Sequence, residues 1–461
     1  MSRIWAVARH MIAEGIRMKI ALVFIAIIAL LMLTLPFMVA GDGVTLKSRV
    51  QSFLSYALGA MTFMLSMLTV FLSCSALSNE IQNKQIFMVA SKPIPRWHFF
   101  LGKWLGIATL NTMILLIAGL SIAGFTWYLR TLPTDIPGDR EAVESEVLTA
   151  RYTQRPQEPN FDVILRDWEQ QMREQGHFSQ TSAAEMALIR EQRLFDIRRG
   201  WRSIGPGQWR EYRFDAPLVN REDPGTIQVR IQPASPAGTD HVMFRMLWQA
   251  GDLSDVNTVT RELESDFVAE RYHVLQVPKS AINNQGVLHL RLANLTQPDT
   301  LIFTGEDSLE LLYGIGSFGW NLFRALCIIW CRLAFLAALG LLASSFLSFP
   351  VACVLCLMIL LVAIGHGFLN DAIQWTDKGA ETGSTPSRMY NIFSLITGRA
   401  LLWIIPDFSR YDPIGNMVSG QVVTLMWVML SFVELIFIKG LLLVLAGCTV
   451  FTKRELAQVV V

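Results

Sequence analysis

The sequence predicts an α-helical membrane protein with six transmembrane helices and an inserted α+β domain that contains a β-sandwich or jelly roll. Of its 461 residues, 52% are hydrophobic and only 17% are charged, whereas charged residues make up about 25% of a soluble domain. Several uncharged stretches are long enough to cross about 30 Å of hydrocarbon. Residues 132–310 carry 28 acidic and 19 basic side chains, a net charge of −9, and the rest of the chain is basic. The two parts therefore face different solvents.

Residues 1–19 predict an amphipathic helix that lies in the membrane interface, because apolar residues alternate there with Arg3, Arg9 and Glu14. Residues 20–40 have no charge and predict the first transmembrane helix, within a membrane block of three helices over residues 20–130. A signal peptide is the competing interpretation. The apolar stretch is longer than the usual signal core, and no cleavage site of small residues follows it.

The loop 78–106 separates the second uncharged stretch, residues 52–78, from the third, residues 104–129. Pro93 and Pro95 remove two amide donors and turn the chain. Charged residues and tryptophans surround this break and suit a segment that leaves the membrane at headgroup level. The loop predicts a short amphipathic helix, a rigid elbow and a point of re-entry.

Residues 131–310 predict a soluble domain with a helical part, residues 139–200, and a β-sandwich, residues 207–305. Apolar residues alternate with polar ones around residues 227–231, 242–248 and 288–292, which is the period of strands buried on one face. The aromatic side chains of this domain predict either a buried core or a platform that stacks on sugars. They are Trp201, Trp209, Tyr212 and Trp248.

Residues 311–461 predict the last three transmembrane helices, with both chain ends on the same side. An interfacial lead-in is expected before the fourth helix, and a re-entrant segment over residues 391–406, because that apolar stretch is too short to span. The helices are expected at residues 326–347, 351–370 and 423–451.

No motif of an enzyme or of a nucleotide-binding protein occurs in the chain. The sequence has no G-x-x-x-x-G-K-[ST], no H-E-x-x-H and no G-x-S-x-G. We therefore expect no catalytic residues, no bound cofactor, no metal site and no nucleic-acid partner. All six cysteines lie in apolar segments. The pairs Cys327/Cys331 and Cys353/Cys356 fall at different depths, so packing is the preferred interpretation of these residues.

Three ionisable residues fall inside predicted membrane helices, where each is costly unless it is paired or hydrated. Arg332 and Glu434 lie at matching depth, which predicts an ion pair between the fourth and sixth helices. The alternative is that both extend separately to the headgroups. Lys439 lies deeper, with no acid left at its level. It predicts either a hydrated path for an anionic substrate or a bond to backbone carbonyls.

The loop 78–106 resembles the first cytoplasmic loop of ABC type-2 exporter permeases. The resemblance is carried by Glu80-Ile81, by Ser91-Lys92-Pro93-Ile94-Pro95-Arg96 and by Gly102-Lys103-Trp104-Leu105-Gly106. The ending Phe451-Thr452-Lys453-Arg454-Glu455-Leu456 and the amphipathic N-terminus are also similar to that family. The insertion lies outside the resemblance.

The resemblance implies a permease subunit of an ATP-driven exporter, with a coupling segment that docks on a separate ATPase subunit. Its coupling residues would be Glu80, Lys92, Pro93, Arg96 and Lys103. ATP and Mg²⁺ would bind to the ATPase, a second permease subunit would complete a homo- or heterodimer, and the lipid bilayer would surround both. The family also implies the plasma (inner) membrane, cytoplasmic chain ends and an extracytoplasmic domain over residues 131–310.

An alternative from another class of protein is a membrane-anchored extracytoplasmic binding or regulatory protein that does not transport. It would use the sandwich to bind a glycan or a protein and the loop to dock a cytoplasmic regulator. A membrane-bound enzyme with its site in the inserted domain is a further alternative, but no residues of the sequence support it.

Overall fold

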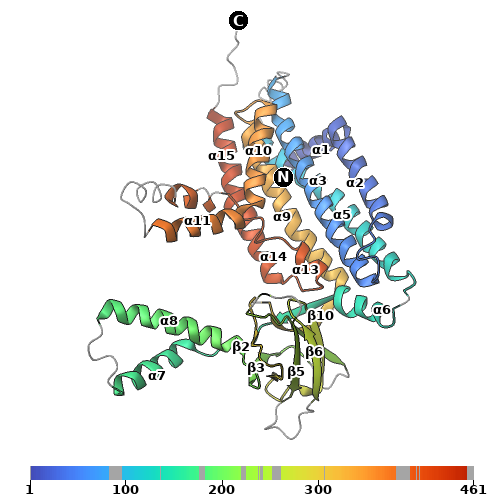
Figure 1. Cartoon of the computed structure of the whole chain (residues 1–461). Coiled ribbons are helices and arrows are strands. Elements are labelled where there is room, and N and C mark those ends of the chain that lie inside the picture. The colour runs from blue at the N-terminus through green and yellow to red at the C-terminus, as the bar shows by residue number, and fades with distance from the viewer. Residues whose placement is uncertain are drawn as a thin grey trace. The chain divides into compact units, whose positions relative to one another are not determined.

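A computed structural model of the chain divides into two compact units (Figure 1). The helical unit comprises Met1–Ala150 and Gly316–Val461, and the inserted unit comprises Arg151–Ile315. The structure describes residues 2–82, 96–134, 136–175, 182–219, 225–236, 238, 242–251, 261–305, 307–380, 395–400, 402–403 and 405–453.

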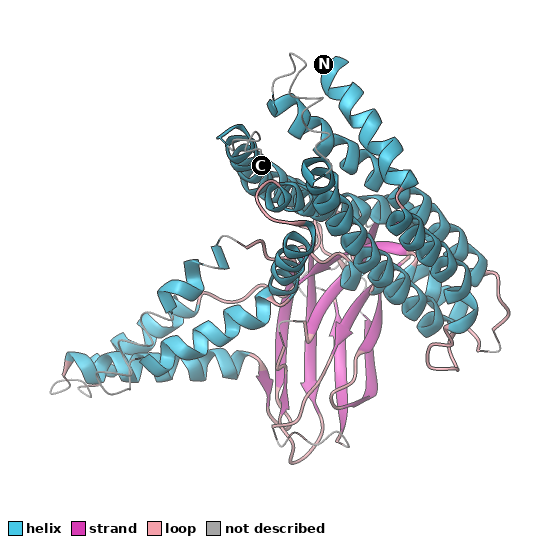
Figure 2. Ribbon diagram, turned by 90° about the horizontal axis from the view of Figure 1, so that it is seen from above, coloured by secondary structure: helices cyan, strands magenta, loops and turns pink. Residues whose placement is uncertain are grey.

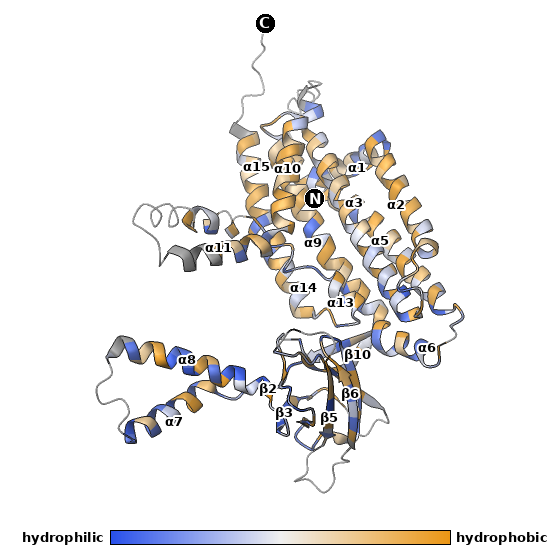
Figure 3. Cartoon of the chain, viewed as in Figure 1, coloured by the Kyte–Doolittle hydropathy of each residue, from blue (hydrophilic) through white to orange (hydrophobic). Residues whose placement is uncertain are grey.

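The helical unit contains five helices that are long and apolar enough to cross a membrane, or six if one bent pair counts as a single span, among the residues just given. These spans indicate a membrane protein, and Figure 3 shows that their helices consist predominantly of hydrophobic residues. The helices of the first half are α1 (Ser2–Arg17), α2 (Lys19–Met38), α3 (Leu46–Gln82) and α5 (Arg96–Arg130). They are helical where the sequence predicts an amphipathic helix and the first three spans.

The fourth span, α9 (Phe318–Ser344), is one continuous helix, and the expected interfacial lead-in before it is wrong. The chain enters α9 directly from strand β10 (Leu309–Ser317), so the glycines of this stretch belong to the end of a strand. Most of α9 is buried by its neighbours, which makes it the central helix of the unit. Its neighbours include α3 and α5.

The fifth span is bent. Helix α10 (Phe349–Ile364) is followed by α11 (His366–Ala380), and the described parts of the two axes differ by 65°. Gly365 lies at the break. The predicted straight helix over residues 351–370 is therefore replaced by a shorter helix and a turned one.

The last span combines three helical segments: α14 (Leu425–Phe432), the π-helix η3 (Val433–Gly440) and α15 (Leu441–Lys453). A short helix, α13 (Ile414–Val418), precedes it. The re-entrant segment expected at residues 391–406 lies only partly within the described residues, where 395–400 are helical. Residues 405–411 form a non-helical stretch that packs among the helices.

The inserted unit contains two four-stranded sheets that share one hydrophobic core. Their strand orders are β1-β10-β4-β7 and β3-β8-β5-β6, which is the arrangement of an eight-stranded jelly roll. Figure 2 shows the strands lying alongside one another. The strands are β1 (Thr149–Gln154), β3 (Trp209–Asp215), β4 (Thr226–Ile231), β5 (Met243–Ala250), β6 (Arg261–Val268), β7 (His273–Pro278) and β8 (Val287–Asn294), with β10 as given above and a small pair of β2 (Ser203–Ile204) with β9 (Leu301–Ile302).

The alternating pattern of the sequence places its apolar members in this core, as predicted. Strand β8 shows the pattern most clearly, because Leu288, Leu290 and Leu292 are fully buried and the intervening His289 and Arg291 are not. Strand β8 pairs with β3 and with β5, and both pairings are antiparallel. Aromatic side chains such as Phe214 and Phe244 are buried in the same core.

The helical part of the insertion differs from its prediction at its beginning. Residues expected to continue a helix form α6 (Asp139–Ala142), a π-helical turn η1 (Val143–Val147) and then strand β1. Farther along, α7 (Phe161–Glu174) and α8 (Ala183–Trp201) lie on the two sides of residues 175–182, as the polar helical pattern predicts (Figure 1). Asn160 and Ser182 cap the two helices through their side chains.

Candidate functional site

Lys103 is the most deeply buried cation at the end of the helical unit where residues 83–95 connect α3 to α5. Only 1% of the residue is exposed, and its Nζ lies 3.0 Å from Oε1 of Glu80, which is 8% exposed. The same Nζ donates a hydrogen bond of 2.6 Å to the carbonyl oxygen of Ala76 and lies 5.1 Å from the centre of the Phe99 ring. These contacts tie the last turns of α3 to the first turns of α5.

Two glycines on α5 let α1 pack directly on this site. A Cβ at Gly102 would meet Cβ of Val7 at 2.7 Å, and a Cβ at Gly106 would meet Cβ of Met11 at 2.7 Å. The spacing Gly-x-x-x-Gly places both on one helix face, and such pairs allow close contact between helices in membranes. Lys103 lies between them and points to α3 instead.

The end of α15 closes the same region. The rings of Phe99 and Phe451 stack with their centres 6.1 Å apart. Gly447 has no side chain, and a Cβ there would lie only 2.3 Å from the ring of Phe100. Helices α1, α3, α5 and α15 therefore meet around the ends of the connection between α3 and α5.

The structure describes only part of the predicted coupling segment. Glu80 and Lys103, 23 positions apart in the sequence, form the buried ion pair. Arg96 begins α5, and its side chain lies outside the described residues, as do Lys92 and Pro93. The family resemblance implies that Glu80 and Lys103 contact a partner, whereas in the structure they contact each other.

The predicted ion pair between Arg332 and Glu434 is wrong. Arg332 lies near the middle of α9 and donates hydrogen bonds from Nη2 to the carbonyl oxygens of Phe408 and Tyr411. Its nearest described carboxylate is that of Asp412, at 3.9 Å. Tyr411 of the non-helical segment 405–411 contacts both side chains, through its carbonyl oxygen to Arg332 and through its hydroxyl to Glu434.

Glu434 instead pairs with Lys439, at 3.0 Å between Oε1 and Nζ, and accepts a hydrogen bond from the hydroxyl of Tyr411. The expectation that no acid lies at the level of Lys439 is therefore wrong. In an α-helix the side-chain neighbours are three or four residues apart. The wider turn of the π-helix η3 brings residues five apart onto one side, which the α-helical depth estimate did not include.

Arg332, Lys439 and His366 share one structural role, which is to contact carbonyl oxygens between Leu402 and Tyr411. His366 contacts the carbonyl oxygen of Leu402 at 3.1 Å, and Nζ of Lys439 lies 3.4 Å from that of Ile405. Arg332 donates to the carbonyl oxygens of Phe408 and Tyr411. Non-helical backbone inside a membrane protein is tolerated only where its polar groups find such partners. The alternative prediction for Lys439, a bond to backbone carbonyls, matches this geometry.

A cavity of about 650 Å³ lies beside the same segment. Its walls come from α9, α10, α11, the stretch 402–410 and the last span, and most of them are apolar. The side chains with ionisable groups that reach it are those of His366, Asp407, Arg410, Glu434 and Lys439.

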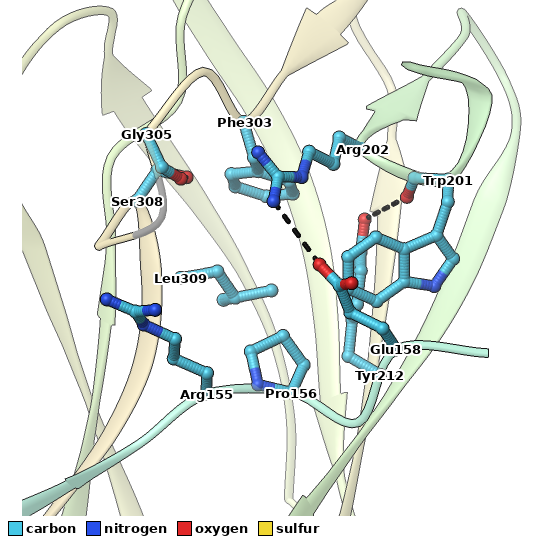
Figure 4. Close-up of a pocket in the computed structure, with 10 residues that line it drawn as sticks. All are labelled: Arg155, Pro156, Glu158, Trp201, Arg202, Tyr212, Phe303, Gly305, Ser308 and Leu309. Carbon is cyan, nitrogen blue, oxygen red and sulfur yellow. Dashed lines mark hydrogen bonds and ion pairs between the residues drawn. The ribbon is translucent and has the colours of Figure 1, made fainter. Parts of the chain in front are cut away.

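A second, smaller pocket of about 270 Å³ lies in the inserted unit (Figure 4). Trp201, Tyr212 and Phe303 provide aromatic surface, and Arg155 and Arg202 bring two cations to it. Figure 4 shows Arg202 in an ion pair with Glu158, at 3.3 Å, and the Tyr212 hydroxyl donating to the carbonyl oxygen of Trp201. The pocket has the size and the mixed character of a site for a small polar ligand.

The predicted aromatic platform is not assembled. Tyr212 and Trp248 are buried in the core, whereas Trp209 is exposed and stacks with the Arg291 guanidinium at 5.2 Å. Trp201 meets Tyr212 edge to face. The alternative interpretation, a buried aromatic core, accounts for two of the four side chains.

Two ionic clusters stabilise the sandwich. Burial raises the pKa of the Glu310 carboxyl, and its partner Arg230 opposes this shift. Burial likewise favours the neutral form of Glu211, but hydrogen bonds from His289 and Arg291 outweigh it and hold the pKa of Glu211 below its ordinary value. No reactive group with an open approach accompanies either cluster.

Metal ligands do not gather in the described parts of the chain. No group of three or more histidine, cysteine or acidic side chains there has the geometry to hold a metal ion. The sulfur atoms of Cys74 on α3 and Cys356 on α10 lie 3.8 Å apart. Cys327 and Cys331 lie on a different helix, α9. No disulfide joins cysteines of the described residues, and four of the six are buried, as the packing interpretation predicts.

Comparison with known proteins yields no family assignment: no family model matches the chain, and no curated protein matches its sequence. Sequence reasoning missed the Gly102/Gly106 contact with α1 and the role of Tyr411. The first had a signal, because Gly-x-x-x-Gly occurs within the apolar stretch of α5. The second had none, since nothing local marks a tyrosine that binds a glutamate 23 residues later.

Proposed function

We propose that the chain is the permease subunit of an ATP-driven ABC exporter of the type-2 class. In this proposal a separate ATPase subunit docks on the loop 78–106 from the cytoplasm, and a second permease subunit completes the translocation path. The inserted domain would lie outside the plasma membrane. The family resemblance of the loop motifs motivates the proposal, and the contacts around Lys103 support it.

The buried ion pair between Glu80 and Lys103 is the observation that carries the proposal. A loop whose ends move independently would deform when a partner exerts force on it. A loop whose two ends are joined inside the protein transmits that force to the helices it connects. Breaking a buried ion pair costs about 3–5 kcal/mol, because one charge is left uncompensated. The two ends of the loop therefore move together, and with them α3 and α5.

Helix α1 would take part in the same motion. Its side chains Val7 and Met11 lie directly on Gly102 and Gly106 of α5, so a tilt of α5 displaces α1 as well. An amphipathic helix in the membrane interface resists movement along the membrane normal. It would act as a support against which the transmembrane helices tilt.

The proposal is tested by gentle purification of the tagged full chain from its native membrane and identification of the proteins that accompany it. We expect a stoichiometric ATPase subunit with the wild type and its loss with a Lys92→Ala/Arg96→Glu variant. The matched control is Arg166→Ala/Arg173→Glu, which removes and reverses two cations on the exposed surface of α7. This control should retain the ATPase.

The result that would overturn the proposal is a well-folded wild-type preparation without any ATPase. Loss of the ATPase from both variants to the same extent would also count against the loop as the docking site. ATP hydrolysis by the complex, stimulated in wild-type membranes and not in the loop variant, gives an independent measurement.

A second candidate function is ligand binding by the inserted domain without transport. The pocket of about 270 Å³ beside Trp201 and Arg202 favours it. Binding of sugars or small carboxylates to the full chain, abolished by Trp201→Ala in the absence of any ATPase partner, would support this second function in place of the first.

A further inference from the structure

The cavity of about 650 Å³ beside the last span is not needed for the coupling described above. Its volume falls within the range of about 300–1,000 Å³ that is usual for sites that bind small molecules. Leu430, Ile438 and Leu442 form part of its wall and are themselves exposed on the surface of the helical unit. In a membrane protein this surface meets hydrocarbon, so the cavity is accessible to the alkyl chains of lipids.

The two carboxylates that reach the cavity already have partners. Asp407 accepts hydrogen bonds from the hydroxyl of Ser409, at 2.6 Å, and from the backbone N–H of Arg410, at 2.9 Å. Its other oxygen lies 3.3 Å from a ring nitrogen of His366. Glu434 is bound by Lys439 and by the Tyr411 hydroxyl. Both carboxylates of the lining therefore already contact donors within the protein.

The guanidinium of Arg410 is different. It is exposed, lies 5.8 Å from the centre of the Tyr411 ring and forms no ion pair with any carboxylate of the described residues. An apolar cavity thus ends at an exposed guanidinium whose N–H donors no carboxylate of the described residues occupies. This combination suits an amphiphile with an alkyl chain and an anionic head.

We propose that the cavity binds one acyl chain of an anionic membrane phospholipid, with the phosphate group on Arg410. The chain would lie against Ile438 and Leu442, and the guanidinium would donate charge-assisted hydrogen bonds to phosphate oxygens. The site goes beyond the proposed transport function, because it requires neither the ATPase nor a direction of transport. A lipid held there would contact both the segment 402–411 and the π-helix of the last span.

The test measures lipids retained by the purified full chain in native mass spectrometry. The chain is offered equal amounts of dioleoyl phosphatidylglycerol, whose head is anionic, and dioleoyl phosphatidylcholine, whose chains are the same and whose head is zwitterionic. We expect one bound phosphatidylglycerol per chain, preferred by about tenfold. Arg410→Gln should abolish the preference, and Arg410→Lys should keep most of it, since an ammonium group also binds phosphate.

A pair of apolar variants tests the cavity itself. Leu442→Trp fills the cavity and should lower retention of both lipids at least fivefold. Leu445→Trp is the matched control, because Leu445 is similarly exposed on the same helix but does not line the cavity. It should leave retention unchanged.

Three outcomes would overturn the proposal. Equal retention of the two lipids by the wild type would remove the headgroup site, and so would an Arg410→Gln variant that retains phosphatidylglycerol as the wild type does. If Leu442→Trp reduces the fraction of dimers without changing lipid retention, a second copy of the chain covers the cavity instead. Arg410 is exposed, so its variants are expected to fold, and they decide the question even if Leu442→Trp does not.

Discussion

The buried pair of Glu80 and Lys103 makes a quantitative prediction about stability. Replacing Lys103 by Met leaves the Glu80 carboxylate buried without a counter-charge, and such a loss costs about 3–5 kcal/mol. Replacing Glu80 by Gln leaves the Lys103 ammonium with only the Ala76 carbonyl and the Phe99 ring, so a loss of similar size is expected. Both residues are almost completely shielded, so salt should change these values little.

The double variant Glu80→Gln/Lys103→Met removes both charges together. It should lose less stability than the sum of the two single variants, by a coupling free energy of about 2–3 kcal/mol. Unfolding of the purified chain by SDS in mixed micelles, followed by circular dichroism, measures all four free energies of unfolding. The matched control is the pair of Arg130 and Glu144, at the other end of α5, whose side chains are both 45% exposed.

Removing the pair of Arg130 and Glu144 should cost no more than about 1 kcal/mol, because exposed ion pairs contribute little. The reasoning is refuted if the coupling between Glu80 and Lys103 is no larger than the coupling between these two. In that case the two ends of the loop would not be joined by electrostatics, and the transmission of force through this pair would lose its basis.

Three further predictions concern other parts of the chain. Exchanging the charges in Glu434→Lys/Lys439→Glu should recover part of the stability that each single variant loses, because these two side chains are paired. The exchange Arg332→Glu/Glu434→Arg should recover none, because Arg332 contacts backbone carbonyls instead. SDS unfolding measures both, and recovery in the second exchange would contradict the structure. Gly340→Ala should destabilise the protein by about 1–3 kcal/mol, because its Cβ would lie 1.9 Å from the Ser73 hydroxyl oxygen. The control Gly59→Ala, with open space around it, should be neutral or slightly stabilising. Equal thermal midpoints of the two variants would show that α3 and α9 do not pack as described. The pKa of Glu211 is lowered in the folded domain, so its ionised carboxylate stabilises the fold at pH values above its unfolded pKa of about 4.5. This stabilisation is lost as the pH falls through the folded pKa, so the difference in unfolding midpoint between wild type and Glu211→Gln should shrink below pH 4.5. A difference that is constant with pH would contradict the assignment.

The arrangement of spans and strands could be predicted from the sequence because it follows from periodicity and length. Uncharged stretches of at least about 20 residues define the spans, and alternation such as that of Leu288, Leu290 and Leu292 defines buried strands. The bend at Gly365 and the π-helix at 433–440 were not predictable in this way. Both features pack against residues 402–411. These residues are distant in the sequence from the bend at Gly365, so no local pattern marks the contact.

The partners of the ionisable residues were less predictable than their positions. Depth along a helix was estimated from the rise of an α-helix, and this estimate assumes that every residue between two charges is α-helical. Glu434 and Lys439 violate that assumption, so a pair five residues apart was overlooked. Glu80 and Lys103 were identified as part of one loop, but burial alone decides whether two such charges face a partner protein or each other.

The intramembrane charges and the irregular segment 402–411 explain each other. A stretch of backbone without helical hydrogen bonds exposes carbonyl oxygens, and each unsatisfied one is costly in an apolar environment. His366, Lys439 and Arg332 supply donors to this stretch from three different helices. Each of these polar side chains would in turn be costly among apolar helices if the carbonyls were absent. The segment and its donors therefore form one polar unit that joins α9, α11 and the last span.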